Sequence, residues 1–134
     1  MVLVKPLFRS CIRFQIKKII ERLLVNMMKL VENLDADSFR QKLEEDMDKV
    51  LLDVRTPMEH EKIRIPNSIL IDINNPMFML DIDKLDRSKS YYVYCRSGNR
   101  SFHAGNYMLK IGFEKVYNLQ QGILSWNGEK EMAA

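Results

Sequence analysis

The sequence predicts an α/β domain with a mainly parallel sheet and helices on both of its faces. After residue 30, short runs of β-branched, aromatic and aliphatic residues recur along the chain. Segments of helical pattern separate most of these runs, and several of them begin with a helix-capping residue. Strands that alternate with helices imply βαβ crossovers, which place helices on both sides of a parallel sheet.

Five segments are expected to be strands, because each has the length and composition typical of one. They are residues 31–34, 50–53, 68–71, 91–94 and 116–119. The 134 residues, of which 46% are hydrophobic, are enough for one domain with its own core. We therefore divide the chain into an N-terminal extension, residues 1–30, and one domain, residues 31–134.

Helix starts are indicated between these strands. Asp35 is suited to cap a helix that follows the first strand, and Thr56 with Pro57 and Glu59 has the spacing of a capping box with proline at the first helical position. Asn75-Pro76 predicts another start of the same kind. A further helix is expected after Cys95, ending at Gly112, and a short last one at 121–126.

The N-terminal extension has a charge of its own. Residues 1–30 contain seven basic residues and one acidic residue, whereas the remainder contains 14 basic and 17 acidic residues. The pI of 8.9 therefore reflects the extension, and we expect no nucleic-acid partner. No apolar run approaches the roughly 18 residues of a membrane span.

Apolar residues recur at helical spacing in the extension, with basic residues largely between them, which predicts a helix with a basic face. The apolar positions are Ile12, Ile16, Ile19, Ile20, Leu23 and Met27. Such a helix can lie on an anionic membrane surface or dock on a partner. We favour two other readings, in which it packs on its own domain or the natural start is Met27 or Met28. We expect no export signal and a cytoplasmic protein.

The two cysteines, Cys11 and Cys95, lie 84 positions apart in segments of different character. This separation argues against a disulfide framework or a metal-ligand cluster. No ligand spacing or phosphate-binding glycine pattern indicates a metal or an organic cofactor, and we expect none.

Cys95 follows a predicted buried strand and opens a loop before a helix, at the sheet edge where ligands bind in such folds. The loop contains Arg96, Ser97, Gly98, Asn99 and Arg100. With a glycine in it, the loop can curl so that backbone N–H groups point inward, and a helix N-terminus and two guanidinium groups favour a thiolate. A lone cysteine after a strand is more often a buried hydrophobe, but the combination indicates a nucleophile with a lowered pKa.

At these residues the sequence resembles the rhodanese-like family of single-domain sulfurtransferases. The segment 95–101, ending in Ser101, is similar to the catalytic loop of that family, and the resemblance extends over about residues 31–130. Leu52-Asp53-Val54-Arg55 with Glu59, Ile65-Pro66, and Gly122 with Trp126 resemble its other motifs. The family usually has glycine, histidine, isoleucine, proline, glycine and alanine where this chain has residues 63–68, and two glycines where it has Gln121-Gly122.

The resemblance implies a five-stranded sheet and transfer of sulfane sulfur, from thiosulfate or a similar anion to a thiophilic acceptor, through a Cys95 persulfide. Residues 96–100 would bind the donor. Asp53 and Arg55 also lie at a strand end, where we favour an ion pair that organises the turn after them, and we assign no role to His60 or His103.

Three other functions compete with this one. Cysteine phosphatases and arsenate reductases also use a thiolate in an anion-binding loop, but phosphatases of the tyrosine and dual-specificity classes resemble a loop one residue longer than the four residues between Cys95 and Arg100. A regulatory rhodanese-like module would often lack the cysteine. A persulfide relay, which passes sulfur to a protein or thiol acceptor, stays open.

Overall fold

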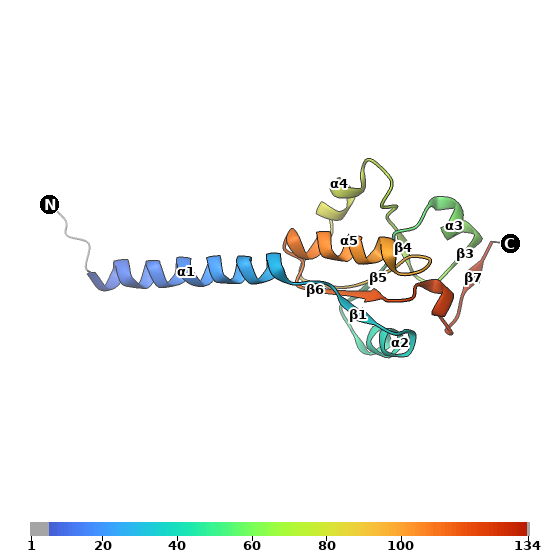
Figure 1. The fold of residues 1–134 in the computed structure, drawn as a ribbon, viewed down its shortest axis with the longest axis horizontal. Helices are drawn as coiled ribbons and strands as arrows, with labels where there is room; N and C mark the ends of the chain where they lie inside the picture. Colours follow the sequence, from blue (N-terminus) through green and yellow to red (C-terminus); the bar gives the residue numbers. More distant parts are fainter. Residues whose placement is uncertain (1–5, 134) are drawn as a thin grey trace.

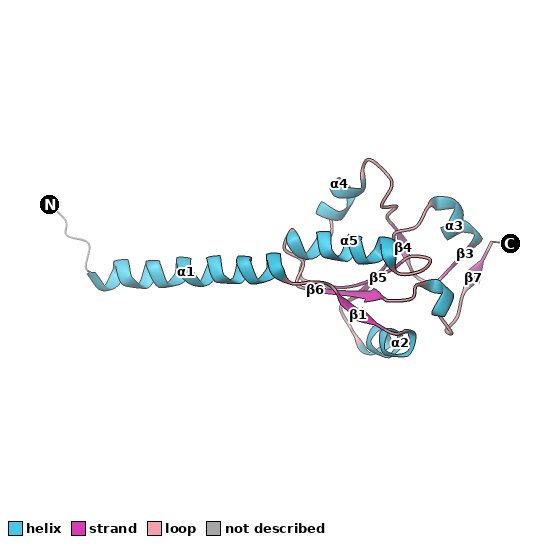
Figure 2. Cartoon of the chain, in the orientation of Figure 1, coloured by secondary structure: helices cyan, strands magenta, loops and turns pink. Residues whose placement is uncertain are grey.

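The computed structural model describes residues 6–133 and has a five-stranded sheet at its centre (Figures 1 and 2). All strands run parallel in the order β1-β6-β5-β2-β4. Their bounds are β1 Glu32–Leu34, β2 Lys49–Asp53, β4 Ile69–Leu70, β5 Ser90–Tyr94 and β6 Lys115–Leu119. The predicted fold class is confirmed, and each predicted strand is present to within one residue at either end.

Helices cover both faces of the sheet. On one face lie α5, Asn99–Lys110, and α4, Phe78–Asp83, and on the other lies α2, Ala36–Glu45 (Figure 1). Two hydrophobic clusters fill the spaces between these layers, one around Met108 and the other around Phe39 and Trp126. Burying apolar side chains on both faces of the strands is the main contribution to the stability of such a fold.

Strand β5 divides its side chains between the two clusters. Tyr91, Val93 and Cys95 lie on the α5 side, whereas Tyr92 and Tyr94 lie on the α2 side. Every residue of β5 is buried, because the strand is central in the sheet. The alternation follows from the two-residue period of a strand, and it places the Cys95 side chain under the helix that follows it.

Two of the predicted helix caps are present. The Asp35 carboxylate accepts a hydrogen bond from the Ser38 amide at 2.8 Å at the start of α2. Thr56 caps α3, Pro57–Lys62, by accepting from the Glu59 amide at 3.3 Å. Both side chains satisfy backbone donors that the first helical turn leaves unpaired.

The predicted helix start at Asn75-Pro76 is wrong by two residues. The Asn75 side chain accepts from the Met77 amide at 2.8 Å, which closes a turn, and α4 begins only at Phe78. Asparagine side chains often close such turns because they compete with helical hydrogen bonds. The expected helix at 121–126 is a single 3₁₀ turn, Ile123–Ser125, and α5 ends at Lys110, just before Gly112.

A small antiparallel pair lies outside the main sheet. It joins β3, Ile63–Arg64, to β7, Glu131–Met132, and the Arg64 guanidinium contacts the Glu131 carboxylate at 3.0 Å. Neither strand was predicted, because two-residue strands carry too little pattern to recognise.

The N-terminal extension contains a 23-residue helix, α1, Pro6–Met28, that projects away from the sheet (Figure 1). Its last turns lie beside the end of α5, where Arg22 forms an ion pair with Glu114. The interpretation that this helix packs on its own domain is wrong, because Ile12, Ile16 and Ile19 are each at least 43% exposed. Residues 1–5 of the expected extension and Ala134 lie outside the described residues. Within the described part of the chain, no helix is long and apolar enough to cross a membrane.

Candidate active site

Cys95 lies directly after β5, at the edge of the sheet where the strands end, and the loop that it opens leads into the first turn of α5. Gly98 ends this loop and adopts a φ of 99°. This left-handed conformation favours glycine, because a side chain would clash with the backbone. The glycine therefore permits the tight curl that brings the loop back toward the cysteine.

Two groups donate hydrogen bonds to the Cys95 sulfur. The backbone N–H of Gly98 lies 3.1 Å from Sγ, and the Ser101 hydroxyl lies 3.3 Å from it. Burial of Cys95 raises the pKa of its thiol, but hydrogen bonds from the Ser101 side chain and from the backbone of Ser101, Gly98 and Ser97 outweigh burial, so the net pKa is lowered. A lower pKa increases the fraction of the reactive thiolate at neutral pH.

The segment that follows β6 packs against the cysteine loop. A Cβ atom added to Gly98 would overlap the carbonyl of Gln120, and one added to Gly122 would overlap the carbonyl of Arg96. The Ile123 amide also donates to the Cys95 carbonyl at 2.9 Å. The Gln121-Gly122 turn, although distant from Cys95 in the sequence, therefore packs directly against the cysteine loop.

Asn118 on β6 connects the sheet to the same loop. Its Nδ2 donates to the Gly98 carbonyl at 3.1 Å and to the Asn33 side chain at 2.9 Å. Asn118 is only 1% exposed, and its Oδ1 has no partner among the described residues. Burying an amide is costly unless it is hydrogen-bonded, so its position is explained by the bond to Gly98.

Arg100 is engaged by a carboxylate. Its two terminal nitrogens contact the Glu59 oxygens at 2.9 and 3.0 Å, in the bidentate geometry that arginine favours. These hydrogen bonds to Arg100 lower the pKa of Glu59 despite its partial burial. The pair joins the first turn of α3 to the first turn of α5. It offsets the positive charge of one of the two arginines that were expected to favour the thiolate.

Arg96 is the loop arginine that is open to a ligand. It is exposed, and among the described residues neither its side chain nor that of Lys62 makes a hydrogen bond or an ion pair. Both line a cavity of about 250 Å³, together with Arg55, and its apolar wall is formed in part by Ile123 and Leu124. The cavity adjoins the cysteine loop, since Arg96 follows Cys95 and Ile123 is hydrogen-bonded to it.

Asp53 and Arg55 form the expected ion pair, on the face of the sheet opposite the Cys95 side chain. Arg55 contacts both Asp53 oxygens at 2.8 and 2.9 Å and donates to the Ile63 carbonyl at 2.6 Å. His60 Nδ1 lies 2.9 Å from Asp53 Oδ2, so this histidine belongs to the same cluster. His103 is exposed on α5.

Tyr94 completes the buried cluster. Its hydroxyl lies 3.1 Å from Asp53 Oδ2 and accepts from the Ile65 amide at 3.1 Å. Burial first, and then the Asp53 charge, raise the pKa of Tyr94 to about 12. The hydroxyl joins β5 to the turn that contains Ile65, a role that the sequence alone did not reveal.

The departures from the family pattern at 63–68 have structural counterparts. Asn67 stands where the family usually has glycine, and it has a φ of 65°. Asparagine tolerates this left-handed conformation better than other residues with a side chain. Arg64, at the usual histidine position, bonds to Glu131 and to the His60 carbonyl.

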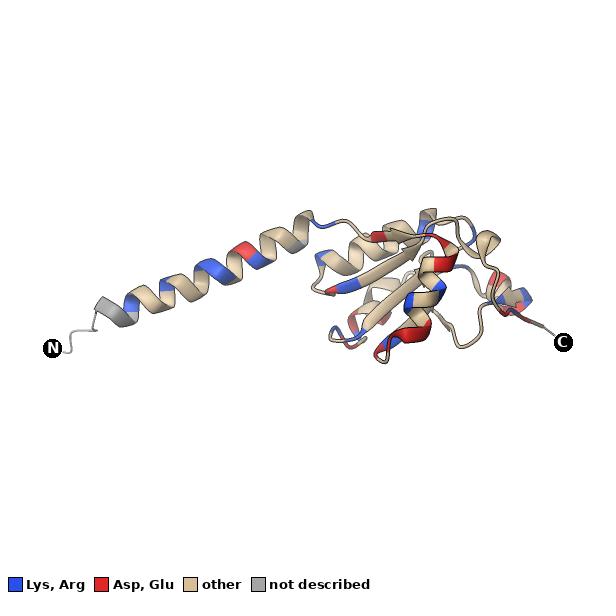
Figure 3. Cartoon of the chain, turned by 90° about the horizontal axis from the view of Figure 1, so that it is seen from below, with Lys and Arg blue, Asp and Glu red and all other residues tan. Residues whose placement is uncertain are grey.

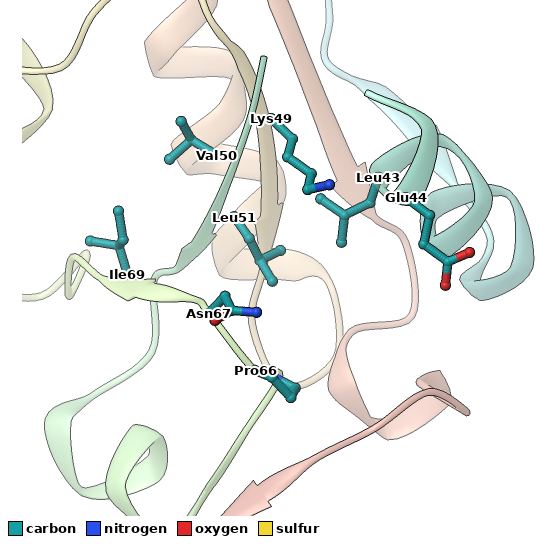
Figure 4. A pocket seen from close by; sticks show the side chains of 8 residues that line it. All are labelled: Leu43, Glu44, Lys49, Val50, Leu51, Pro66, Asn67 and Ile69. Carbon is teal, nitrogen blue, oxygen red and sulfur yellow. The ribbon is translucent and has the colours of Figure 1, made fainter. Parts of the chain in front are cut away.

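A second cavity, of about 290 Å³, lies between α2 and strands β2 and β4 (Figure 4). Its lining includes Leu43, Leu51, Pro66 and Ile69. None of its lining residues belongs to the loop that begins at Cys95, so this cavity is separate from the candidate active site. In the described part of the chain, no group of three or more His, Cys, Asp or Glu residues is arranged to hold a metal ion.

Comparison with known proteins identifies the family. The model of the rhodanese-like domain matches residues 35–129, which is more than two thirds of the chain. The chain belongs to the rhodanese-like family of sulfurtransferases. The matched residues include four of the five strands of the main sheet, namely β2, β4, β5 and β6, together with the whole cysteine loop.

Rhodanese-like relatives are similar over most of the domain. A curated protein of Allochromatium vinosum named sulfurtransferase is 33% identical over 99 residues, covering 72% of this chain and 89% of that relative. The putative sulfur carrier protein YrkF of Bacillus subtilis is 33% identical over 101 residues, covering 75% of this chain and 54% of that protein. A solved rhodanese-like domain protein from Staphylococcus aureus superposes with a TM-score of 0.67 at 26% identity, covering 78% of this chain and all of that one.

Proposed function

We propose that this rhodanese-like protein transfers sulfane sulfur through a persulfide on Cys95. The observation that carries the proposal is the pair of hydrogen bonds to the Cys95 sulfur, from the Gly98 amide at 3.1 Å and the Ser101 hydroxyl at 3.3 Å. Donors arranged in this way stabilise an anionic sulfur, and a persulfide is anionic as well. The same loop can thus favour both the attacking thiolate and the loaded product.

The reaction takes place in two displacements. With thiosulfate as donor, the Cys95 thiolate attacks the outer sulfur, the sulfur–sulfur bond of thiosulfate breaks, and sulfite leaves with the bonding electron pair. A thiophilic acceptor, such as cyanide in an assay, then attacks the terminal sulfur of the persulfide and leaves as thiocyanate. Cys95 returns as the thiolate, so neither an oxidant nor a reductant is consumed.

We assign donor binding to Arg96, aided by Lys62. Both cations line the cavity beside the loop, and a sulfonate group suits charge-assisted hydrogen bonds to arginine. Of the other loop residues, Ser97 and Gly98 supply backbone donors, and Asn99 begins α5. Arg100 has its first partner in Glu59, and Asp53 with Arg55 supports the turn beneath the site.

The acceptor is proposed to be larger than cyanide. Leu124 borders the cavity and is 65% exposed, which favours contact with an apolar part of a thiol or of a protein that accepts the sulfur. The similarity to a putative sulfur carrier protein supports such a relay. We place the reaction in the cytoplasm, where the free thiols of Cys11 and Cys95 would stay reduced.

Intact mass spectrometry tests the proposal. After treatment with thiosulfate, the protein should gain the mass of one sulfur atom, and cyanide should remove it. The adduct should be absent from Cys95→Ser and retained by Cys11→Ser, the matched control at the other thiol. An adduct that persists in Cys95→Ser would refute the assignment of the nucleophile, and hydrolysis of an aryl phosphate ester without any adduct would favour the phosphatase alternative.

A further inference from the structure

Helix α1 takes no part in the proposed sulfur transfer, and it presents an exposed surface of its own. Nine of its large apolar side chains that the structure describes are at least half exposed, namely Phe14, Ile16, Ile19, Ile20, Leu23, Leu24, Val25, Met27 and Met28. Soluble monomers rarely leave so many apolar side chains together in water. Figure 1 shows that the ribbon of α1 projects beyond the sheet for most of its length, so its own domain does not cover it.

The charges of α1 form two rows, which corrects the expected single basic face. With about 100° of rotation per residue, the apolar strip of Ile12, Ile16, Ile19 and Leu23 has basic residues on both sides. One row is Arg9, Arg13 and Lys17, and the other is Lys18 and Arg22, with Lys29 directly after the helix. Figure 3 shows basic positions spread along α1, with acidic colour toward the end of the helix nearer the domain.

The charge argues against a second copy of this chain as the partner. Residues 6–29 contain six basic residues and one acidic residue, Glu21, a net charge of +5. Two such helices packed along the apolar strip would bring their basic rows together with almost no opposite charge between them. That arrangement would also leave Phe14 and Val25, on the other side of the helix, exposed to water.

An anionic lipid surface supplies the opposite charge that a second copy of α1 lacks, and it can cover apolar side chains on more than one side of the helix. Its phosphate groups offer negative charge on each side of the apolar strip, and long lysine and arginine side chains reach them while their stems remain in an apolar environment. The headgroup layer also surrounds more of the helix than one partner helix can. Since α1 is not apolar enough to cross a bilayer, it would lie in the plane of the interface.

We propose that α1 binds to the surface of anionic membranes and that the rhodanese-like domain is held there. The inference does not depend on the proposed sulfur transfer, because it rests on the exposure and charge of α1 alone. The full chain should float with vesicles of phosphatidylcholine and phosphatidylglycerol in equal parts, and should not float with phosphatidylcholine alone. In about 1 M NaCl, where the screening length is about 3 Å, most of this binding should be lost.

Two sets of substitutions separate the contributions to binding. Charge reversal at Arg13→Glu, Lys17→Glu and Lys18→Glu should weaken vesicle binding by about 100-fold or more. The matched control reverses three exposed lysines of the domain, Lys89→Glu, Lys110→Glu and Lys130→Glu, and should bind as the unchanged protein does. Replacing Ile16, Ile19 and Leu23 with glutamine keeps the charge and should also release the protein from vesicles.

A circular dichroism spectrum and a thermal unfolding curve that match those of the unchanged protein serve as the folding control for every variant. Equal flotation with neutral and anionic vesicles would overturn the proposal, and so would unchanged flotation of the charge-reversed helix. Sedimentation equilibrium without lipid covers the remaining alternative. If the chain fails to float but forms a dimer that the glutamine variant abolishes, α1 is an interface between copies of this chain and the lipid proposal is wrong.

Discussion

Asn118 Nδ2 donates to the carbonyl of Gly98 at 3.1 Å and so joins strand β6 to the loop that contains Cys95. The amide of the same glycine donates to the Cys95 sulfur. Because one residue takes part in both bonds, the position of the sulfur's donor depends on a side chain from the neighbouring strand. Asn118 is thus a positioning residue for the loop.

Replacing Asn118 should therefore raise the pKa of Cys95. In Asn118→Ala the Gly98 carbonyl loses its side-chain donor, and the loop becomes free to move its amide away from Sγ. The pKa is measured from the pH dependence of alkylation by iodoacetamide in a Cys11→Ser background. Asn33→Ala is the matched control, since it removes the other bond of Asn118 and leaves Gly98 untouched. Equal shifts in the two variants would mean that Asn118 acts only through general packing.

Ser101→Ala should raise the same pKa more directly, because it deletes a donor to the sulfur. A hydrogen bond to a charged group is worth about 1.5–3 kcal/mol, so its loss disfavours the thiolate and raises the pKa of Cys95. At neutral pH the thiolate fraction, and with it alkylation and persulfide formation, should fall. Ser97→Ala is the control, since Ser97 lowers the pKa of Cys95 through its backbone. An unchanged pKa of Cys95 in Ser101→Ala would show that the Ser101 hydroxyl does not stabilise the thiolate.

Gly98→Ala should abolish persulfide formation. Its Cβ would overlap the Gln120 carbonyl, and its φ of 99° is unfavourable for alanine, so the loop must move. Gly112→Ala provides the comparison. Gly112 has a φ of 105°, but its Cβ would meet only the Arg87 side chain at 3.7 Å. That variant should lose about 1–2 kcal/mol of unfolding free energy and still accept sulfur. Normal loading of Gly98→Ala would show that the loop tolerates displacement.

Asp53→Asn should strongly destabilise the domain. It removes the negative charge beside Arg55, whose side chain is 3% exposed, and leaves that cation buried without a counter-ion. Breaking a buried pair in this way costs about 3–5 kcal/mol, measured by denaturant unfolding. The exposed pair of Arg64 and Glu131 gives the reference, and Arg64→Gln should cost no more than about 1 kcal/mol. If both variants lost a similar amount of unfolding free energy, burial of Arg55 would not explain the cost of Asp53→Asn.

The pair between Glu59 and Arg100 predicts a contribution to stability that depends on pH. The pKa of Glu59 is lowered in the folded protein, chiefly by hydrogen bonds from Arg100, so folding favours the ionised form. The contribution is present in full above the unfolded pKa of glutamate, about 4.3, and is lost as pH falls through the lower folded pKa. Glu59→Gln should remove this part of the acid dependence. An unchanged dependence would show that Arg100 does not hold Glu59 in solution.

The sequence predicted the main sheet because its central strands are long and apolar on both faces. It also predicted the position of Cys95, since a strand, a loop with glycine and a helix follow one another there. The partners of the loop were harder to predict. Ser101 was expected at the site because it directly follows the loop in the sequence, whereas Asn118 approaches from β6 and is brought to the loop only by the fold.

One missed residue had a visible signal. Asn118 is a polar residue in the otherwise apolar end of a strand, and a buried amide in such a place requires a hydrogen-bond partner. Lys62 had no such signal, because an exposed lysine in a short helix resembles any other. The engagement of Arg100 by Glu59 also depends on two helix starts meeting in space, 41 positions apart in the sequence.

The sheet has a direction, and the two ends of the domain differ because of it. All five strands are parallel, α1 leads into the amino end of β1, and Cys95 follows the carboxyl end of β5. The anchored helix and the sulfur-bearing loop would therefore lie toward opposite ends of the sheet. A sulfur acceptor could reach the persulfide at the end of the domain that is remote from the lipid-bound helix.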